Sequence, residues 1–181
     1  GLRGLKELTA KEGCTLYMLL LGVITILLAK LSNQQDIVVG TPIAARRHAD
    51  LERVIGMFVN TLALRNFPMG ERSFNDFLAE VKQRTLDAFE NQDYQFEDLV
   101  EKVLVGRDPS RNPLFDVIFA LQNMEAQSEG IPDVEIPDLK VSPYNREGHT
   151  AKFDITLFCF EGRESLFFMF EYCTRLFKEE T

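Results

Sequence analysis

The sequence predicts an α/β or α+β layered sandwich, in which helices pack against a β-sheet. Two observations support this class. Helix-like and strand-like segments alternate in blocks along the 181 residues: two helices, two strands, two helices and then further strands. The composition, 45% hydrophobic and 27% charged, is ordinary for a globular protein. We therefore expect one domain, or one large lobe of a larger domain.

Two helices are predicted in the N-terminal part. Residues 4–12 form a polar helical segment, and Gly13 ends it. Thr15 is a suitable N-cap for a second helix that runs to about Leu31. This helix is apolar on nearly all sides, so we expect it to be buried on most faces. Its apolar run, residues 16–29, is shorter than the roughly 20 residues of a membrane span, and no membrane span is expected.

Two strands follow these helices. Residues 36–43 open with a β-branched run and predict a strand, which we expect to leave the sheet near Gly40 and Pro42. Residues 44–54 are charged and irregular. Residues 57–66 predict the second strand.

A second pair of helices comes next. Ser73 is a good N-cap for a helix that runs to about Asn91, and residues 96–104 predict a shorter one. Asp93 is a plausible N-cap in the turn between the two helices. Six apolar residues share a broad stripe at helical spacing on the longer helix: Phe74, Phe77, Leu78, Val81, Leu86 and Phe89.

The C-terminal part predicts more strands. They cover residues 114–122, a short stretch at 139–143, and the pair 153–160 and 165–173, which a tight turn at 161–163 joins. The last two strands are apolar on both faces, so we expect both faces to be covered. Their phenylalanines are expected in the core: Phe158, Phe160, Phe167, Phe168 and Phe170. Asp154 is expected to pair with Lys152 on the same face.

Composition excludes several classes of function. The net charge is −8 and no Lys/Arg block is present, so nucleic-acid binding is not expected. The three cysteines form no CxxC pair and suit free thiols in a reducing cytosol. The two histidines, His48 and His149, have no ligand spacing around them, so no metal site is expected. The first residues show no signal-peptide pattern.

Three segments carry a family resemblance. Residues 55–65 read IGMFVNTLALR, residues 90–100 read ENQDYQFEDLV and residues 107–117 read RDPSRNPLFDV. In this order and spacing they resemble the last three signature motifs of condensation domains from nonribosomal peptide synthetases, of the kind found in bacterial lipopeptide and peptide-antibiotic synthetases. The FVNTLALR stretch resembles condensation domains more than the related epimerisation and heterocyclisation domains. Flanking segments agree with the same family: residues 39–46 (VGTPIAAR, with Ala45 where the family often has Gly), 152–157 and 170–181.

The resemblance implies one lobe of the two-lobed chloramphenicol-acetyltransferase-like fold, with a mixed sheet, flanking helices and a substrate tunnel between the lobes. Residues 1–181 would form the C-terminal lobe. The family's catalytic HHxxxDG motif lies in the other lobe and is absent here, because His48 sits in RRHAD. The isolated lobe is therefore expected to be inactive and to expose apolar surface, and the family's terminal helix is expected to be absent from residues 1–181.

The resemblance also implies a function. Condensation domains belong to cytoplasmic, multifunctional enzymes in which carrier proteins present substrates as 4'-phosphopantetheine thioesters, and an acceptor amine attacks the donor carbonyl. The expected partners are carrier-protein domains, the N-terminal lobe and an adjacent adenylation domain, and no cofactor is expected to bind directly. The alternatives are a carrier-binding or structural lobe, or half of an epimerisation or heterocyclisation domain.

Four residues are candidates for a site. Asn60 shares a strand face with apolar neighbours, and a buried amide needs a partner. It either faces the tunnel and orients substrate or catalytic histidine, or bonds a neighbouring loop. Arg46 either lines the inter-lobe cleft or lies in a solvated loop. Arg107 and Arg111 could contact a pantetheine phosphate, but a tie to nearby carboxylates is favoured.

Two segments are expected to bridge the lobes in this family. We place them at residues 40–50 and 106–113, both polar and arginine-bearing. The stretch 125–149 is the alternative.

Overall fold

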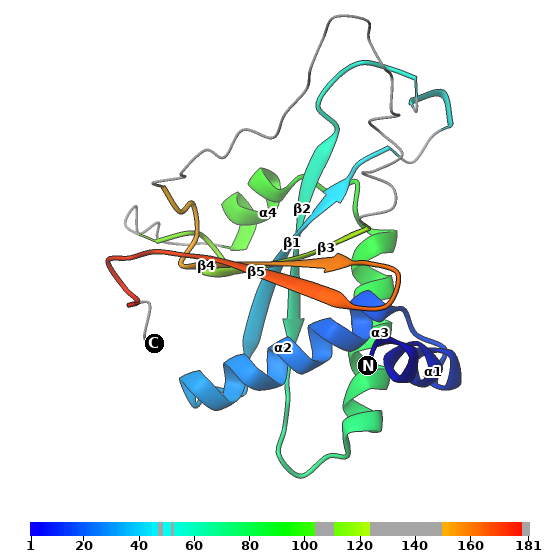
Figure 1. Ribbon diagram of the computed structural model, residues 1–181. Helices are drawn as coiled ribbons and strands as arrows, with labels where there is room; N and C mark the ends of the chain where they lie inside the picture. Colours follow the sequence, from blue (N-terminus) through cyan, green and yellow to red (C-terminus); the bar gives the residue numbers. More distant parts are fainter. Residues whose placement is uncertain (47–48, 52, 104–110, 124–149, 179–181) are drawn as a thin grey trace, which may run out of the picture.

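The computed structural model describes residues 1–46, 49–51, 53–103, 111–123 and 150–178. Five strands form one mixed sheet in the order β2-β1-β3-β4-β5, with helices beside it (Figure 1). This arrangement confirms the predicted class. The strands are β1 Ile37–Ala44, β2 Val59–Asn66, β3 Val117–Asn123, β4 Ile155–Glu161 and β5 Leu166–Tyr172.

The ladders between neighbouring strands differ greatly in length. β1 and β2 are antiparallel and paired along their full length, from Ile37↔Asn66 to Ala44↔Val59. β3 pairs with β4 in parallel and β4 with β5 antiparallel, again along whole strands. In contrast, the parallel ladder that joins β1 to β3 has only the pairs Val39↔Val117 and Gly40↔Ile118.

The helix boundaries follow local signals in the sequence. They are α1 Leu2–Glu12, α2 Leu16–Ser32, α3 Phe74–Glu90 and α4 Phe96–Val103, with a 3₁₀ turn η1 at Ala49–Leu51. Gly13 ends α1 with φ 60°, a conformation that glycine adopts at little cost. The hydroxyls of Thr15 and Ser73 accept the N–H groups of Met18 and Asp76, so both predicted N-caps are confirmed.

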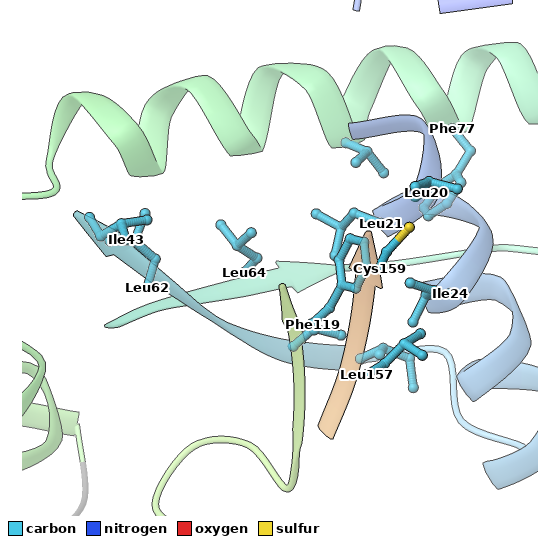
Figure 2. Packing of buried hydrophobic residues seen from close by; sticks show 13 residues of the cluster. Leu20, Leu21, Ile24, Ile43, Leu62, Leu64, Phe77, Phe119, Leu157 and Cys159 are labelled. Carbon is cyan, nitrogen blue, oxygen red and sulfur yellow. The ribbon is translucent and has the colours of Figure 1, made fainter. Parts of the chain in front are cut away.

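α2 and α3 cover one face of the sheet and bury its apolar side chains (Figure 2). Phe119 of β3 and Cys159 of β4 are completely buried and point toward Leu21 of α2. The cluster comprises Leu20, Leu21, Ile24, Ile37, Val39, Ile43, Leu62, Leu64, Phe77, Val81, Phe119, Leu157 and Cys159.

The expectation that the first strand leaves the sheet near Gly40 and Pro42 is wrong, because β1 continues to Ala44. Pro42 lies opposite Thr61, and the N–H of Thr61 donates to the Asn60 side chain. Ala45 donates to Phe58, so Pro42 and Thr61 form a non-hydrogen-bonded pair and the ladder to β2 needs no N–H from Pro42. Residues 40–44 are thus part of the described sheet, and the expected bridging role of 40–50 is wrong for them.

Strand β3 begins later than predicted. The N–H of Phe115 donates to the carbonyl of Pro113 at 2.9 Å, and Leu114 between them has φ 68°. This tight turn keeps Leu114 out of the sheet, so β3 starts only at Val117. The predicted short strand at 139–143 and most of the loop at 106–113 lie outside the described residues.

α2 is buried on most faces, as predicted, and its exposed apolar residues, Val23, Leu27 and Leu31, form one stripe with a spacing of four residues. The expected burial of β5 is wrong. On β5, the predicted core residues Phe167, Phe168 and Phe170 are 56%, 48% and 60% exposed, because β5 is an edge strand of the described sheet. Phe158 and Phe160 of β4 are half-buried and stack on each other with ring centroids 6.4 Å apart.

No single described helix is long and apolar enough to cross a bilayer. α1 and α2 reach that length only together, and their axes turn by 102° at the break between them.

Candidate functional site around Asn60

Asn60 is almost fully buried on β2, and its amide uses all of its hydrogen-bonding capacity within the chain. The Nδ2 group donates to the carbonyls of Gln92 (2.8 Å) and Tyr94 (2.9 Å). The Oδ1 atom accepts the N–H of Thr61 (2.8 Å) and the N–H of Phe96 (3.3 Å). The side chain therefore bonds a neighbouring loop, as one of the two hypotheses stated.

The bond from Phe96 identifies the cap of α4. Phe96 is the first residue of this helix, and its N–H has no carbonyl within the helix to bond. Asn60 supplies that acceptor from a strand 36 residues earlier in the sequence. The expectation that Asp93 is the N-cap is wrong, because α4 begins three residues after it.

A cavity of about 350 Å³ lies next to Asn60, between β2, the end of α3 and α4. Tyr94 lines this cavity, and the Lys102 ammonium lies over its ring, 5.0 Å from the ring centroid. The lining is mostly apolar: Thr61, Leu62, Ala63, Ala88, Asn91, Tyr94, Phe96 and Leu99. Such a cavity suits an apolar group held by a few polar contacts.

The three motif segments meet at this place. Asn60 belongs to the first and Tyr94 and Phe96 to the second. The third contributes Phe115, whose ring lies 5.4 Å from that of Phe96. Phe115 also packs directly against the backbone of Gly40, where a Cβ atom would overlap the ring. Sequence spacing could not show this convergence, although a glycine within a strand is a known signal of close approach.

Arg46 organises the loop between β1 and β2. Its guanidinium donates to the carbonyls of Leu51, Val54 (2.8 Å) and Gly56 (3.0 Å), and it lies 4.2 Å from the centre of the Phe58 ring. The arginine is thus bound by its own loop instead of solvated. A role in lining an inter-lobe cleft stays a prediction.

Arg111 forms an ion pair with Asp116, which is the favoured tie to a nearby carboxylate. Arg107 lies outside the described residues. The expected pair between Asp154 and Lys152 is wrong, since the structure has no ion pair between these two described residues. Burial and then the charge of Asp116 hold the pKa of Asp154 above its ordinary value, and Arg111 partly offsets this.

Other reactive groups are sparse in this region. Within the described residues, no three side chains of the metal-binding types come together. His48 and His149 lie outside the described residues. All three cysteines are free thiols, as predicted, and burial raises the pKa of Cys159 to about 11. Within the described residues, no carboxylate, imidazole or thiol bonds Asn60 or lines the cavity, which offers walls, dipoles and hydrogen bonds.

Comparison with known proteins identifies the family. Residues 2–181 match the family model described as "Condensation domain". The chain is 55% identical over 177 residues to gramicidin S synthase 2 of Aneurinibacillus migulanus and 55% identical over 180 residues to tyrocidine synthase 3 of Brevibacillus parabrevis. These alignments cover 98% and 99% of this chain, but only 4% and 3% of the relatives' length.

Solved structures agree with the fold. A four-domain nonribosomal peptide synthetase bound to AMP and glycine superimposes with a TM-score of 0.85 at 26% identity, over 98% of this chain and 14% of that one. The X-domain from teicoplanin biosynthesis gives a TM-score of 0.84 at 22% identity, over 97% of this chain and 40% of that one, which shows the fold alone. With the match to the family model over nearly every residue, these findings show that the chain belongs to the condensation-domain family.

Proposed function

We propose that this chain is the C-terminal lobe of a condensation domain that forms peptide bonds in a cytoplasmic nonribosomal peptide synthetase. The observation that carries the proposal is the convergence of all three motif segments on one cluster around Asn60 and the adjacent apolar cavity. Family membership and the names of the relatives support it.

In the proposed reaction, the amine of an acceptor substrate attacks the thioester carbonyl of a donor substrate. A C–N bond forms, the C–S bond breaks, and the released thiolate takes up the proton that the amine loses. The 4'-phosphopantetheine arms of two carrier-protein domains would present these substrates. Much of the barrier is alignment, so a site that fixes both arms supplies most of the acceleration by proximity.

This chain would contribute the wall of the tunnel. The turn and helix around Tyr94 and Phe96 are hydrogen-bonded to β2 through Asn60 and line the cavity. Neither His48 nor His149 stands in an HHxxxDG sequence, so the proposal assigns the general base to the N-terminal lobe. The carrier, adenylation and N-terminal parts of the synthetase are the proposed partners.

The test uses the whole condensation domain with donor and acceptor carrier proteins loaded with aminoacyl thioesters. Mass spectrometry should detect a dipeptide on the acceptor carrier, and the 181-residue chain alone should give none. A matched control replaces the histidines of HHxxxDG in the intact domain. Inversion of the donor's α-carbon without a new amide bond would instead identify an epimerisation domain and contradict the proposal.

A further inference from the structure

We propose that Asn60 is a positioning residue, which fixes the turn at 91–95 and the start of α4 against β2 and thereby orients the Tyr94 wall of the cavity. It would not contact substrate itself. The inference deepens the proposed function and rests on it for the role in catalysis, whereas its structural part can be tested independently.

The hydrogen bonds support this role. An amide group offers two N–H donors and two acceptor lone pairs, and all four are engaged in Asn60. A substrate could bond this amide only if one of these partners were released. Releasing the carbonyl of Gln92 or Tyr94, or the N–H of Phe96, would leave a backbone group without a partner in a partly buried place.

A second asparagine shows that burial on this strand does not by itself produce such a network. Asn66 lies on the same face of β2 and is 1% exposed, against 4% for Asn60. Neither its Nδ2 nor its Oδ1 has a hydrogen-bond partner in the described part of the chain. The two residues share type, strand, face and burial, so Asn66 is a matched control for the truncation of Asn60.

The bonds reach the cavity through Tyr94. Its carbonyl accepts from Asn60 and its ring lies against Lys102 of α4. Phe96, the next cavity residue, bonds the same amide through its N–H. One side chain on the strand therefore sets the backbone position of two residues in the wall.

The first experiment is hydrogen–deuterium exchange of the whole condensation domain, read by mass spectrometry. Asn60→Ala should raise amide exchange across residues 92–99 by about tenfold or more, since local opening then breaks fewer bonds. Exchange in the N-terminal half of α3 should stay near the wild-type rate. Asn66→Ala should leave residues 92–99 unchanged. Equal exchange of residues 92–99 in Asn60→Ala and wild type would overturn the inference.

Asn60→Asp keeps the test decisive if the alanine variant unfolds globally. A carboxylate still accepts from Thr61 and Phe96, but its other oxygen faces the carbonyls of Gln92 and Tyr94. Burial and the two facing carbonyl oxygens disfavour the carboxylate and raise the pKa of this aspartate. Protonation restores one donor, so exchange of residues 92–99, relative to wild type at the same pH, should fall as the pH drops from 8 to about 4. A ratio that does not change with pH would count against the inference.

The last arm measures condensation by the whole domain. Asn60→Ala should lower kcat/KM, and it should lower it by a smaller factor in a Tyr94→Ala background, because the two act through one wall. If Asn60→Ala lowers kcat/KM by the same factor with and without Tyr94→Ala, and amide exchange of residues 92–99 is unaltered, Asn60 contacts the substrate directly. That result would overturn the inference. If the wild-type domain forms no dipeptide, the proposed function fails, while the exchange result still decides whether Asn60 holds the turn.

Discussion

The two edge strands of the sheet, β2 and β5, differ in what covers them. At the β2 edge, the turn at 91–95 and α4 pack beside the strand, and the Asn60 side chain takes up the N–H of Thr61. At the β5 edge, Phe167, Met169 and Phe170 are each at least half exposed. Exposed apolar edge strands are rare in isolated proteins because they invite pairing with other chains.

The difference suggests that the two edges meet different surroundings. The N–H of Thr61 on the β2 edge bonds within this chain, and β2 carries residues of the first motif segment. The β5 edge and the stripe of Val23, Leu27 and Leu31 on α2 are apolar surface of the kind that contacts another protein segment. Substitutions at the β2 edge should therefore mainly change stability, whereas substitutions at the β5 edge should mainly change association with other chains.

The largest expected effect compares one core-face residue on each edge strand. Leu62→Ala on β2 should lower the free energy of unfolding by about 3 kcal/mol, because Leu62 is 7% exposed and its loss leaves a cavity. Phe168→Ala on β5 should lower it by about 1 kcal/mol or less, because half of that side chain already lies in water. Urea unfolding measures both. Equal losses would show that β5 is packed as well as β2.

A second prediction concerns the other face of the sheet, near the β2 edge. Gly40→Ala should cost about 2 kcal/mol, because the added methyl group overlaps the Phe115 ring, which is only 5% exposed and cannot easily move. Gly70→Ala is the control, since no atom lies within 4 Å of its added methyl group. Thermal unfolding of both variants checks this. A stable Gly40→Ala protein would mean that Phe115 is loosely held.

A third prediction tests the β5 edge directly. The double substitution Phe167→Lys and Met169→Lys should reduce self-association and the binding of an apolar dye, because it places two charges on an exposed apolar strand. Stability should change by less than about 1 kcal/mol, since both side chains are at least half exposed. Light scattering and dye fluorescence are the measurements. A wild-type chain that is monomeric and binds no dye would contradict the premise.

The smallest expected effect lies at the β2 edge. Asp36 and Arg65 form a two-pronged ion pair, with Nε–Oδ1 at 2.8 Å and Nη2–Oδ2 at 2.5 Å. The hydrogen bond from Arg65 holds the pKa of Asp36 below its ordinary value. Its contribution is therefore present above the ordinary pKa of an aspartate and is lost as the pH falls through the lowered value.

Unfolding of wild type and Asp36→Asn between pH 7 and pH 2 tests this pair. The two proteins should differ slightly and constantly above about pH 5, and the difference should disappear at the acid end. If the difference in the free energy of unfolding between the two proteins grew on acidification, the pKa of Asp36 would not be lowered by folding.

Local signals allowed much of the fold to be predicted. Thr15, Ser73 and Gly13 act within four residues of the helix ends that they define, so their roles could be inferred from the sequence. The exposure of β5 could not be inferred from the sequence, because an apolar strand has the same sequence pattern at the centre and at the edge of a sheet.

The candidate site was predictable only in its parts. Asn60 and Arg111 were identified, and one stated alternative for each matches its contacts. That Asn60 caps α4 in place of Asp93 depends on a contact across 36 residues, which no local spacing encodes. The rest of the cavity wall could not be inferred for the same reason, because it forms only when three separate segments pack together.

The two-pair ladder between β1 and β3 has a consequence for folding. The antiparallel pairs β1–β2 and β4–β5 each join strands that are consecutive in the sequence. In contrast, the pair Val39–Val117 joins β1 to β3 across the segment that contains β2, α3 and α4. Closing that long loop gains very few backbone hydrogen bonds, so the join depends on side chains such as Val39 and Phe119 becoming buried together. The strands on either side of this ladder should therefore behave as separate cooperative units that form early, and their docking through the core should be the late, slow event.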